Sequence, residues 1–375
     1  MSADVGVIAK LSHAMLTSRT LCSVTLREMT MNTTAIPALR ERVLSRPRQL
    51  TRLPDFIALM KPRVMALAVF TAVVGMMIAP GHLNPAFVTV AILAIAAGAG
   101  AAAVLNMWYD ADIDRMMSRT AMRPIPRGTV SRREALAFGL VLAGGAVAVL
   151  ALALNTTAAA LLALAIFFYA VVYTAWLKRT TSQNIVIGGV AGALPPVIGW
   201  AAATGEVGIE PLVLFLITFL WTPPHFWALS LNRVDEYARA GVPMLPVVAG
   251  KSATSKQIFV YSVLLLPASI LPCTLGFAGG VYGAVATICG AILVLLATQL
   301  RTSRGVNHHA ARRLFAFSIL YLFLLFAALL ADHVLQPTVT VIARADAAVQ
   351  SSQAALSAGH LGSMWGPLRI TTGGV

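Results

Sequence analysis

Long apolar stretches separated by short polar segments dominate this chain. Nine of them reach the roughly 20 residues that a helix needs to cross a bilayer. They lie near 57–79, 86–108, 134–154, 158–177, 184–203, 211–231, 257–276, 280–298 and 312–332. Backbone polar groups cannot stay unpaired in lipid, so each stretch is expected to be helical. The pattern predicts an all-α polytopic membrane protein with nine transmembrane helices.

The composition agrees with a lipid environment. The chain is 58% hydrophobic and only 11% charged, whereas a soluble domain carries about 25% charged residues. Its three cysteines form no CxxC pair and no cluster spaced with histidines. The sequence therefore indicates neither a zinc site nor a disulfide framework.

The placement of the basic residues predicts the orientation. A net charge of +14 could indicate a nucleic-acid partner. However, all of the 28 Lys and Arg except Arg344 and Arg369 lie in the N-terminal region or in one alternate set of loops. By the positive-inside rule this side is cytoplasmic. We expect a protein of the cell inner membrane, bound to lipid and not to nucleic acid, with a cytoplasmic N-terminus and a periplasmic C-terminus.

The two ends differ from the membrane domain, which is expected to span 51–335. Residues 1–50 contain no stretch long enough to cross a bilayer, and 336–375 are rich in Ala, Ser, Thr and Gly. Such segments bury too little apolar surface to form a packed core. They are expected to be a flexible cytoplasmic extension and a flexible C-terminal tail.

A first acidic site stands at the inner end of the second stretch. Asn106, Asp110 and Asp114 are spaced by four residues, which aligns them on one helical face. Carboxylates at a membrane boundary are costly unless neutralised, and their hard oxygens suit Mg²⁺ bridging to substrate phosphates. Asp112 lies off this face and fits a solvated residue. The alternative is that the whole row is a solvated helix end paired with arginines.

Basic side chains close to this site could bind a diphosphate. Arginine binds phosphate in a bidentate manner, and the prolines beside Arg123 would stiffen its presentation. The candidates for such an anion clamp are Arg63, Arg123, Lys178 and Arg179. The alternative is that these residues only set the membrane topology.

A second acidic site, Asp235 and Glu236, follows the sixth stretch. With four helices in each half, the two acidic sites occupy equivalent positions. This indicates two four-helix halves plus a ninth helix, with the two acidic loops brought together. The expected metal ligands are Asp110, Asp114, Asp235 and Glu236, and Asn106 joins them in the expected catalytic set.

The sixth stretch contains an unusual polar cluster. Pro223 and Pro224 should break or kink the helix and free backbone carbonyls. His225 lies beside them, between Trp221 and Trp227. A histidine in an apolar span is a functional candidate, and flat rings with a nitrogen donor suit a porphyrin. Alternatively, His225 only satisfies the freed carbonyls.

Several strings in this chain resemble the haem O synthases, a family of the UbiA-type intramembrane prenyltransferase superfamily. The strings are Lys61-Pro-Arg63-Val64, Asn106-Met-Trp-Tyr-Asp110-Ala-Asp112-Ile-Asp114, Arg123-Pro-Ile-Pro126, Gln183-Asn-Ile-Val-Ile-Gly188-Gly189, Trp221-Thr-Pro-Pro-His225-Phe-Trp227 and Ala240-Gly-Val-Pro-Met-Leu-Pro246. The Asn-xxx-Asp-xxx-Asp pattern marks the superfamily. The strings at 221–227 and 240–246 distinguish haem O synthases from quinone prenyltransferases.

The resemblance implies that farnesyl diphosphate and haem b are the substrates, that Mg²⁺ is the cofactor, and that the product serves the maturation of haem-copper terminal oxidases. Haem A synthase or oxidase assembly proteins would be partners. In the superfamily the second acidic motif commonly has two spaced aspartates, whereas Asp235 and Glu236 are adjacent. Adjacent helical residues point about 100° apart. The two carboxylates therefore cannot share one face.

Three other functions fit parts of the pattern. A prenyltransferase acting on a quinone precursor or another aromatic acceptor would keep the metal site and change the acceptor pocket. A transporter could also have broken helices, but it would carry ionisable residues deep in its spans. A structural oxidase subunit would need no acidic pair. The clustering of carboxylates at one membrane face favours the prenyltransferase.

Overall fold

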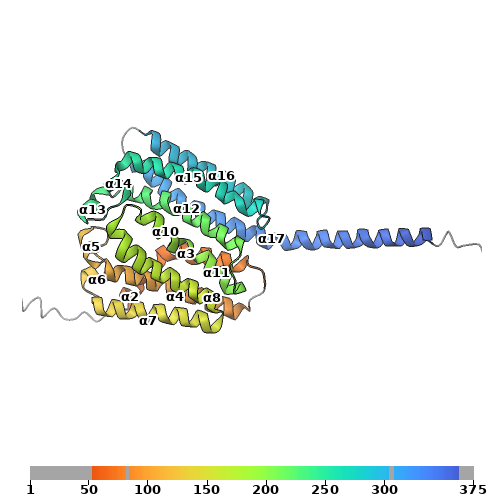
Figure 1. Cartoon of the computed structure of the whole chain (residues 1–375), viewed down its shortest axis with the longest axis horizontal. Helices are drawn as coiled ribbons and strands as arrows, with labels where there is room; N and C mark the ends of the chain where they lie inside the picture. Colours follow the sequence, from red (N-terminus) through yellow and green to blue (C-terminus); the bar gives the residue numbers. More distant parts are fainter. Residues whose placement is uncertain (1–52, 82–83, 304–307, 363–375) are drawn as a thin grey trace, which may run out of the picture. The chain divides into compact units, whose positions relative to one another are not determined.

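The computed structural model describes residues 53–81, 84–303 and 308–362, with side chains up to residue 335. This part of the chain is helical, and its long helices pack side by side (Figure 1). Eight spans are long and apolar enough to cross a membrane, and a bent pair at the start makes a ninth. In chain order the spans are α2 (Leu53–Met60) with α3 (Pro62–Met77), α4 (Pro85–Tyr109), α7 (Arg132–Ala153), α8 (Thr156–Phe167) with η1 (Phe168–Leu177) and α9 (Lys178–Thr180), α10 (Asn184–Ala193) with α11 (Pro195–Thr204), α12 (Ile209–Leu231), α15 (Gly250–Thr274), α16 (Gly280–Thr302) and α17 (His308–Gly362). The predicted fold class is confirmed.

The ends of the chain extend beyond what the structure describes. The predicted N-terminal extension, 1–50, lies outside the described residues. At the other end α17 continues to Gly362, so part of the predicted C-terminal tail, 336–375, is helical. Residues 363–375 again lie outside the described part.

The first span is bent by 52° where α2 meets α3. Lys61 stands at the bend with φ 53° and ψ 55°, and Pro62 begins α3. Proline fits the first turn of a helix because the N–H that it lacks would have no helical partner there. The bend therefore follows from the sequence Lys-Pro and leaves Lys61 between two helices.

The fourth span contains a ten-residue π-helix, η1. Its bonds join residues five apart, and the Thr174 hydroxyl also donates to the Tyr169 carbonyl at 2.7 Å. Such wide turns are rare and occur often at functional sites. Here η1 leads directly to Lys178 and Arg179.

The helix α12 runs through Pro223 and Pro224 without interruption. The expected break in this span is therefore wrong. Along its length α12 packs against α10, α15 and α17, and such neighbours let a membrane helix tolerate proline. An interruption does occur in the fifth span, at Leu194, where Pro195 and Pro196 begin α11.

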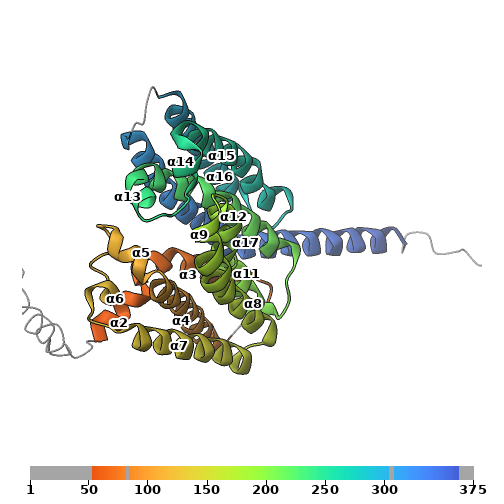
Figure 2. The same cartoon turned by 60° about the vertical axis from the view of Figure 1, so that its left-hand side comes forward.

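The two larger of three hydrophobic clusters contain most of the described long helices. One is formed by α3, α4, α7, α8 and α11. The other is formed mainly by α12, α15, α16 and α17, so the ninth helix packs into the second cluster. The short helices α5 (Ala111–Met116), α6 (Pro124–Arg127), α13 (Val234–Arg239) and α14 (Leu245–Val248) lie at the same end of both clusters (Figures 1 and 2). Both acidic segments are on these short helices.

The first and fifth spans are in direct backbone contact. A Cβ atom on Gly199 would lie 1.8 Å from the Ala72 carbonyl oxygen, and one on Gly75 would lie 2.2 Å from the Pro196 carbonyl oxygen. Small residues allow such approaches between membrane helices, where close packing replaces the hydrophobic effect as the driving force. The two glycines therefore fix how α3 sits against α11.

We expect Gly199→Ala to lower the melting temperature of the detergent-solubilised protein by several degrees, because the added methyl group would push α3 and α11 apart. Gly144→Ala on α7 is the matched control, because a Cβ there meets no atom within 4 Å. It should be neutral or slightly stabilising. Equal melting temperatures for the two variants would contradict the proposed close contact.

The orientation is tested by cysteine labelling in a background without Cys22, Cys273 and Cys289. Glu206→Cys, in the loop before α12, should react with an impermeant maleimide in intact spheroplasts. Ala238→Cys, on α13, should react only after permeabilisation, because its end of the bundle carries the basic loops. The opposite labelling pattern would reverse the predicted orientation.

Candidate active site

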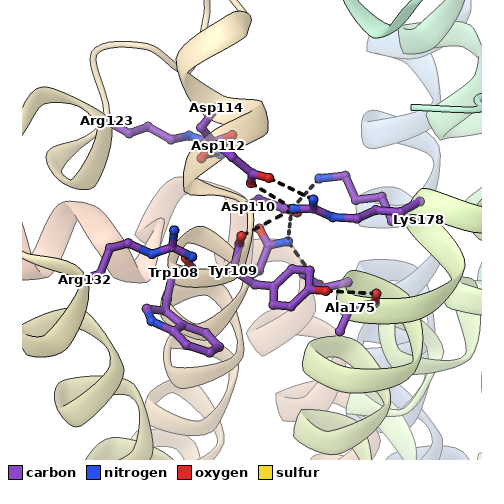
Figure 3. A network of polar contacts seen from close by, with 12 residues as sticks. Trp108, Tyr109, Asp110, Asp112, Asp114, Arg123, Arg132, Ala175 and Lys178 are labelled. Carbon is purple, nitrogen blue, oxygen red and sulfur yellow. Dashed lines mark hydrogen bonds and ion pairs between the residues drawn. The ribbon is translucent and has the colours of Figure 1, made fainter. Parts of the chain in front are cut away.

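The first acidic site is buried at the end of the second span. α4 ends at Tyr109 and α5 begins at Ala111, and Asp114 N donates to Asp110 O across this junction at 2.8 Å. Asp110 is 1% exposed and Asp114 is 3% exposed, whereas the Asp112 side chain is 56% exposed. The burial follows the common face that the spacing predicts for Asn106, Asp110 and Asp114. Figure 3 shows Asp110, Asp112 and Asp114 at the junction.

The Asn106 amide connects three segments of the chain. Its Nδ2 donates to Asp110 Oδ2 at 2.9 Å and to Thr174 Oγ1 at 3.1 Å. Its Oδ1 accepts a hydrogen bond from Lys61 Nζ at 2.9 Å. Asn106 thus joins the bend of the first span, the acidic helix end and the π-helix.

Two cations from the end of the fourth span neutralise the acidic row. Lys178 Nζ forms an ion pair with Asp110 Oδ2. The Arg179 guanidinium lies 3.4 Å from Asp110 Oδ1 and donates to both oxygens of Asp112 at 2.9 Å. The hydrogen bonds from Arg179 are the main reason that the pKa of Asp112 falls to about 2. Asp112 is therefore an ionised anchor for Arg179.

Arg123 neutralises Asp114. Its Nη1 lies 2.8 Å and 2.7 Å from the two carboxylate oxygens. Pro124 begins the short helix α6 directly after Arg123, which fixes the backbone from which the side chain extends. The Thr120 hydroxyl donates to the Asp114 carbonyl at 2.9 Å and closes the turn between them.

The second acidic site meets the first through Glu236. Its Oε1 accepts from Arg233 Nη1 at 2.9 Å and from Ser118 Oγ, just after α5, at 3.4 Å. Its Oε2 is buried and has no hydrogen-bond partner in the described part of the chain. Asp235 is exposed. The structure therefore separates the two adjacent acids, and only Glu236 faces the first site.

The donors match the chemistry of Mg²⁺. Asp110, Asp114 and Glu236 offer hard carboxylate oxygens, which Mg²⁺ prefers, and the unpartnered Glu236 Oε2 is available to a cation. As the side chains stand, no three acidic, His or Cys side chains among the described residues gather closely enough to hold an ion. The oxygens of Asp110 and Asp114 are instead engaged by Lys178, Arg179 and Arg123.

A largely apolar cavity of about 480 Å³ lies beside this polar network. Lys61, which binds Asn106, is part of its wall, and so are Tyr169 and Tyr173. Arg63 also lines the cavity but forms no ion pair in the described part of the chain. The volume of the cavity is typical of small-molecule sites. Trp221 and His225 line the same cavity.

His225 lies between two aromatic rings. The Trp221 ring stacks on it with centroids 4.3 Å apart and an interplanar angle of 18°, and Phe315 stacks at 4.7 Å and 25°. Trp227 does not line the cavity. It is 1% exposed and packs edge-on against Tyr261, 5.6 Å away. Residues two apart on a helix point about 200° apart, so Trp227 cannot share the face of His225 and is withdrawn from the acceptor site.

Sequence reasoning missed four contributors. Lys61 stands in a string that resembles the family, but only the bend shows that its amine, and not Arg63, enters the polar network. The other three are single hydroxyl residues with no local pattern around them: Thr174, Ser118, and Ser318, whose Oγ lies 2.8 Å from His225 Nδ1. Their roles depend on which helices become neighbours, and a sequence alone does not show this.

Comparison with known proteins identifies the family. The model of the UbiA prenyltransferase family matches residues 68–324. A protein named protoheme IX farnesyltransferase in Azorhizobium caulinodans is 59% identical over 280 residues, covering 74% of this chain and 91% of its own length. One of the same name in Afipia carboxidovorans is 60% identical over 278 residues, with 73% and 88% covered.

Solved structures show the same fold at low identity. A digeranylgeranylglyceryl phosphate synthase has a TM-score of 0.64 at 19% identity, with 75% of this chain and 98% of that chain covered. A UbiA homologue from Archaeoglobus fulgidus, solved with DMAPP and Mg²⁺, has a TM-score of 0.56 at 17% identity, with 73% and 99% covered. Sequence and fold agree, and the chain belongs to the UbiA prenyltransferase family.

Proposed function

We propose that the protein transfers the farnesyl group of farnesyl diphosphate to a vinyl group of haem b, which gives haem O. The observation that carries this proposal is the shared cavity. Its lining includes both Lys61, which hydrogen-bonds the buried acidic network, and His225, which lies between two aromatic rings. A charged leaving group and a flat acceptor can thus meet in one largely apolar space.

The polar end suits a diphosphate because it already gathers cations. Lys61, Lys178 and Arg179 converge on Asn106 and Asp110, and Arg123 holds Asp114. An arriving diphosphate would take over these cations as its counter-ions. The carboxylate oxygens would then be released for a metal ion.

The metal in this proposal is Mg²⁺, held by Asp110, Asp114 and Glu236. When bound, it would supply positive charge to the diphosphate oxygens as the leaving group departs. Asn106 would keep Asp110 oriented through its Nδ2 hydrogen bond of 2.9 Å. Lys61 would add charge from the cavity wall, and Lys178 from its ion pair with Asp110.

The proposed reaction is an electrophilic alkylation. The allylic C–O bond of farnesyl diphosphate breaks, and diphosphate leaves with the electron pair. The vinyl π electrons form the new C–C bond to the farnesyl carbon, which leaves a cation next to the porphyrin ring. Water adds to this cation and loses a proton to the solvent, so the product carries a hydroxyethylfarnesyl group.

The cavity wall would protect the first cation. Most of its lining is apolar, with Leu162, Ile166 and Leu322 among the contributors. An apolar wall excludes water, which would otherwise capture the farnesyl cation before the acceptor does. The farnesyl chain itself is apolar and gains free energy from burial against these side chains.

Haem b is favoured over a quinone precursor as the acceptor for two reasons. Relatives that are about 60% identical to this chain carry the name protoheme IX farnesyltransferase. In addition, the cavity lining includes the flat rings of Trp221 and Phe315, and between them His225, a nitrogen donor that suits a porphyrin with an iron centre. The site would face the cytoplasm from the inner membrane, and its product would pass to haem A synthase or to oxidase assembly proteins.

The proposal is tested by incubating the purified protein with haem b, farnesyl diphosphate and Mg²⁺. We expect a product heavier than haem b by one farnesyl group and one hydroxyl group, detected by mass spectrometry, and no such product after chelation of Mg²⁺. Farnesylation of a quinone precursor but not of haem b would replace the proposed acceptor.

Substitution of the acidic row tests the metal ligands. Asp110→Asn and Asp114→Asn should each lower kcat by about 100-fold or more, because buried charge at the leaving group is lost. Asp112→Asn is the control and should cost less than about tenfold, because its exposed side chain acts through Arg179. Turnover rates and membrane insertion are both measured, and equal losses at all three positions would exclude the buried pair as the metal site.

A further inference from the structure

Ser318 on α17 is fully buried beside His225. Its Oγ donates to the Phe315 carbonyl at 2.7 Å and lies 2.8 Å from His225 Nδ1. Neither of these two partners belongs to the acidic network or to the proposed metal ligands. The hydroxyl therefore has no role in the diphosphate end of the site.

The serine hydroxyl determines which nitrogen of His225 carries the proton. A hydroxyl has one hydrogen, and a carbonyl oxygen can only accept. Because Ser318 gives its hydrogen to the Phe315 carbonyl, it must accept from His225 Nδ1–H. In the neutral imidazole the lone pair then lies on Nε2.

The orientation of the ring is fixed from both faces. Trp221 and Phe315 stack on His225, and the Trp221 Nε1–H donates to the Ser318 carbonyl at 2.7 Å. Ser318 thus holds the imidazole through its hydroxyl and the Trp221 ring through its carbonyl, and Phe315, on the same helix, covers the other face. A rotation of the imidazole would have to break the hydrogen bond to Ser318 and both stacking contacts.

The remaining nitrogen belongs to a side chain that lines the ligand cavity. His225 lines the cavity together with Trp221 and Phe315. No group in the described part of the chain hydrogen-bonds Nε2, since the recorded polar contact of this ring is the one at Nδ1. A neutral imidazole with a free Nε2 and a hydrogen bond at Nδ1 is the arrangement that metal-binding histidines use.

We propose that Ser318 is a positioning residue that holds His225 as the Nδ1–H tautomer, so that Nε2 is an axial ligand of the haem iron. This inference rests on the proposed function, because the iron is supplied by the acceptor substrate. An axial bond fixes the centre of the porphyrin relative to α12. The vinyl group can then be presented to the farnesyl carbon from a defined position.

The experiment titrates ferric haem into the purified full chain in lipid nanodiscs. Haem affinity is read from the Soret band, and axial ligation from the iron–histidine stretching band in resonance Raman spectra of the reduced complex. Farnesyl diphosphate affinity and melting temperature are measured on the same samples. The variants are His225→Ala, Ser318→Ala and Ser269→Ala.

Ser269→Ala is a matched control. Ser269 is also fully buried, donates to a helical carbonyl at 2.8 Å and contacts a second side chain, Tyr321, at 2.6 Å. It does not line the cavity. Ser318→Ala retains the backbone carbonyl that Trp221 uses, so it removes only the hydroxyl.

We expect the histidine band in the wild-type protein and its loss in His225→Ala, with recovery when free imidazole is added. Ser318→Ala should weaken haem binding by about tenfold and shift or broaden the band, as is typical when the partner of a ligating histidine is removed. Farnesyl diphosphate affinity should stay unchanged. Ser269→Ala should keep the wild-type spectrum.

The possible failures are distinguishable. A wild-type spectrum and affinity in Ser318→Ala would overturn the role of Ser318 while His225 remains the ligand. A histidine band that survives in His225→Ala would overturn the axial ligand as well, but not the farnesyl transfer. Absence of any haem binding together with absence of a farnesylated product would instead overturn the proposed function.

Discussion

The arrangement of this end of the molecule follows from the need to neutralise two buried carboxylates. Asp110 and Asp114 are almost fully buried, and an unpaired charge in such a place costs several kcal/mol. The compensating cations come from separate segments: Lys178 and Arg179 lie at the end of the fourth span, and Arg123 directly precedes α6. Each ion pair therefore also joins one helix end to another.

In the proposed reaction, neutralisation and catalysis use the same groups. The cations that make the buried acids tolerable are those that a diphosphate would need, and the acids are those that a magnesium ion would need. This explains why a site with so many charges can sit at the end of an apolar bundle. The proposed acceptor is recognised by a separate, nearly uncharged set of side chains around His225.

Much of the fold was predictable because hydrophobic length and charge placement act locally. The nine spans, the buried face of Asn106, Asp110 and Asp114, and the exposure of Asp112 follow from the spacing of residues along the chain. The hydrogen-bond and ion-pair partners of these residues could not be predicted from this spacing. The π-helix that brings Thr174 to Asn106, and the pairing of Ser318 with His225, depend on contacts between distant helices. The unbroken path of α12 through two prolines likewise depends on its neighbours.

The bend at Lys61 has a consequence for the balance between stability and activity. Lys61 has a positive φ, which among the described non-glycine residues occurs only here, and this conformation costs a lysine about 1 kcal/mol or more. Glycine would adopt it without strain but has no amine to offer Asn106 or a substrate. A search for substitutions that relieve backbone strain would therefore select glycine at this position and remove the amine that hydrogen-bonds Asn106 and that the proposed reaction uses. The strain at residue 61 is a part of the fold that selection for stability alone would remove.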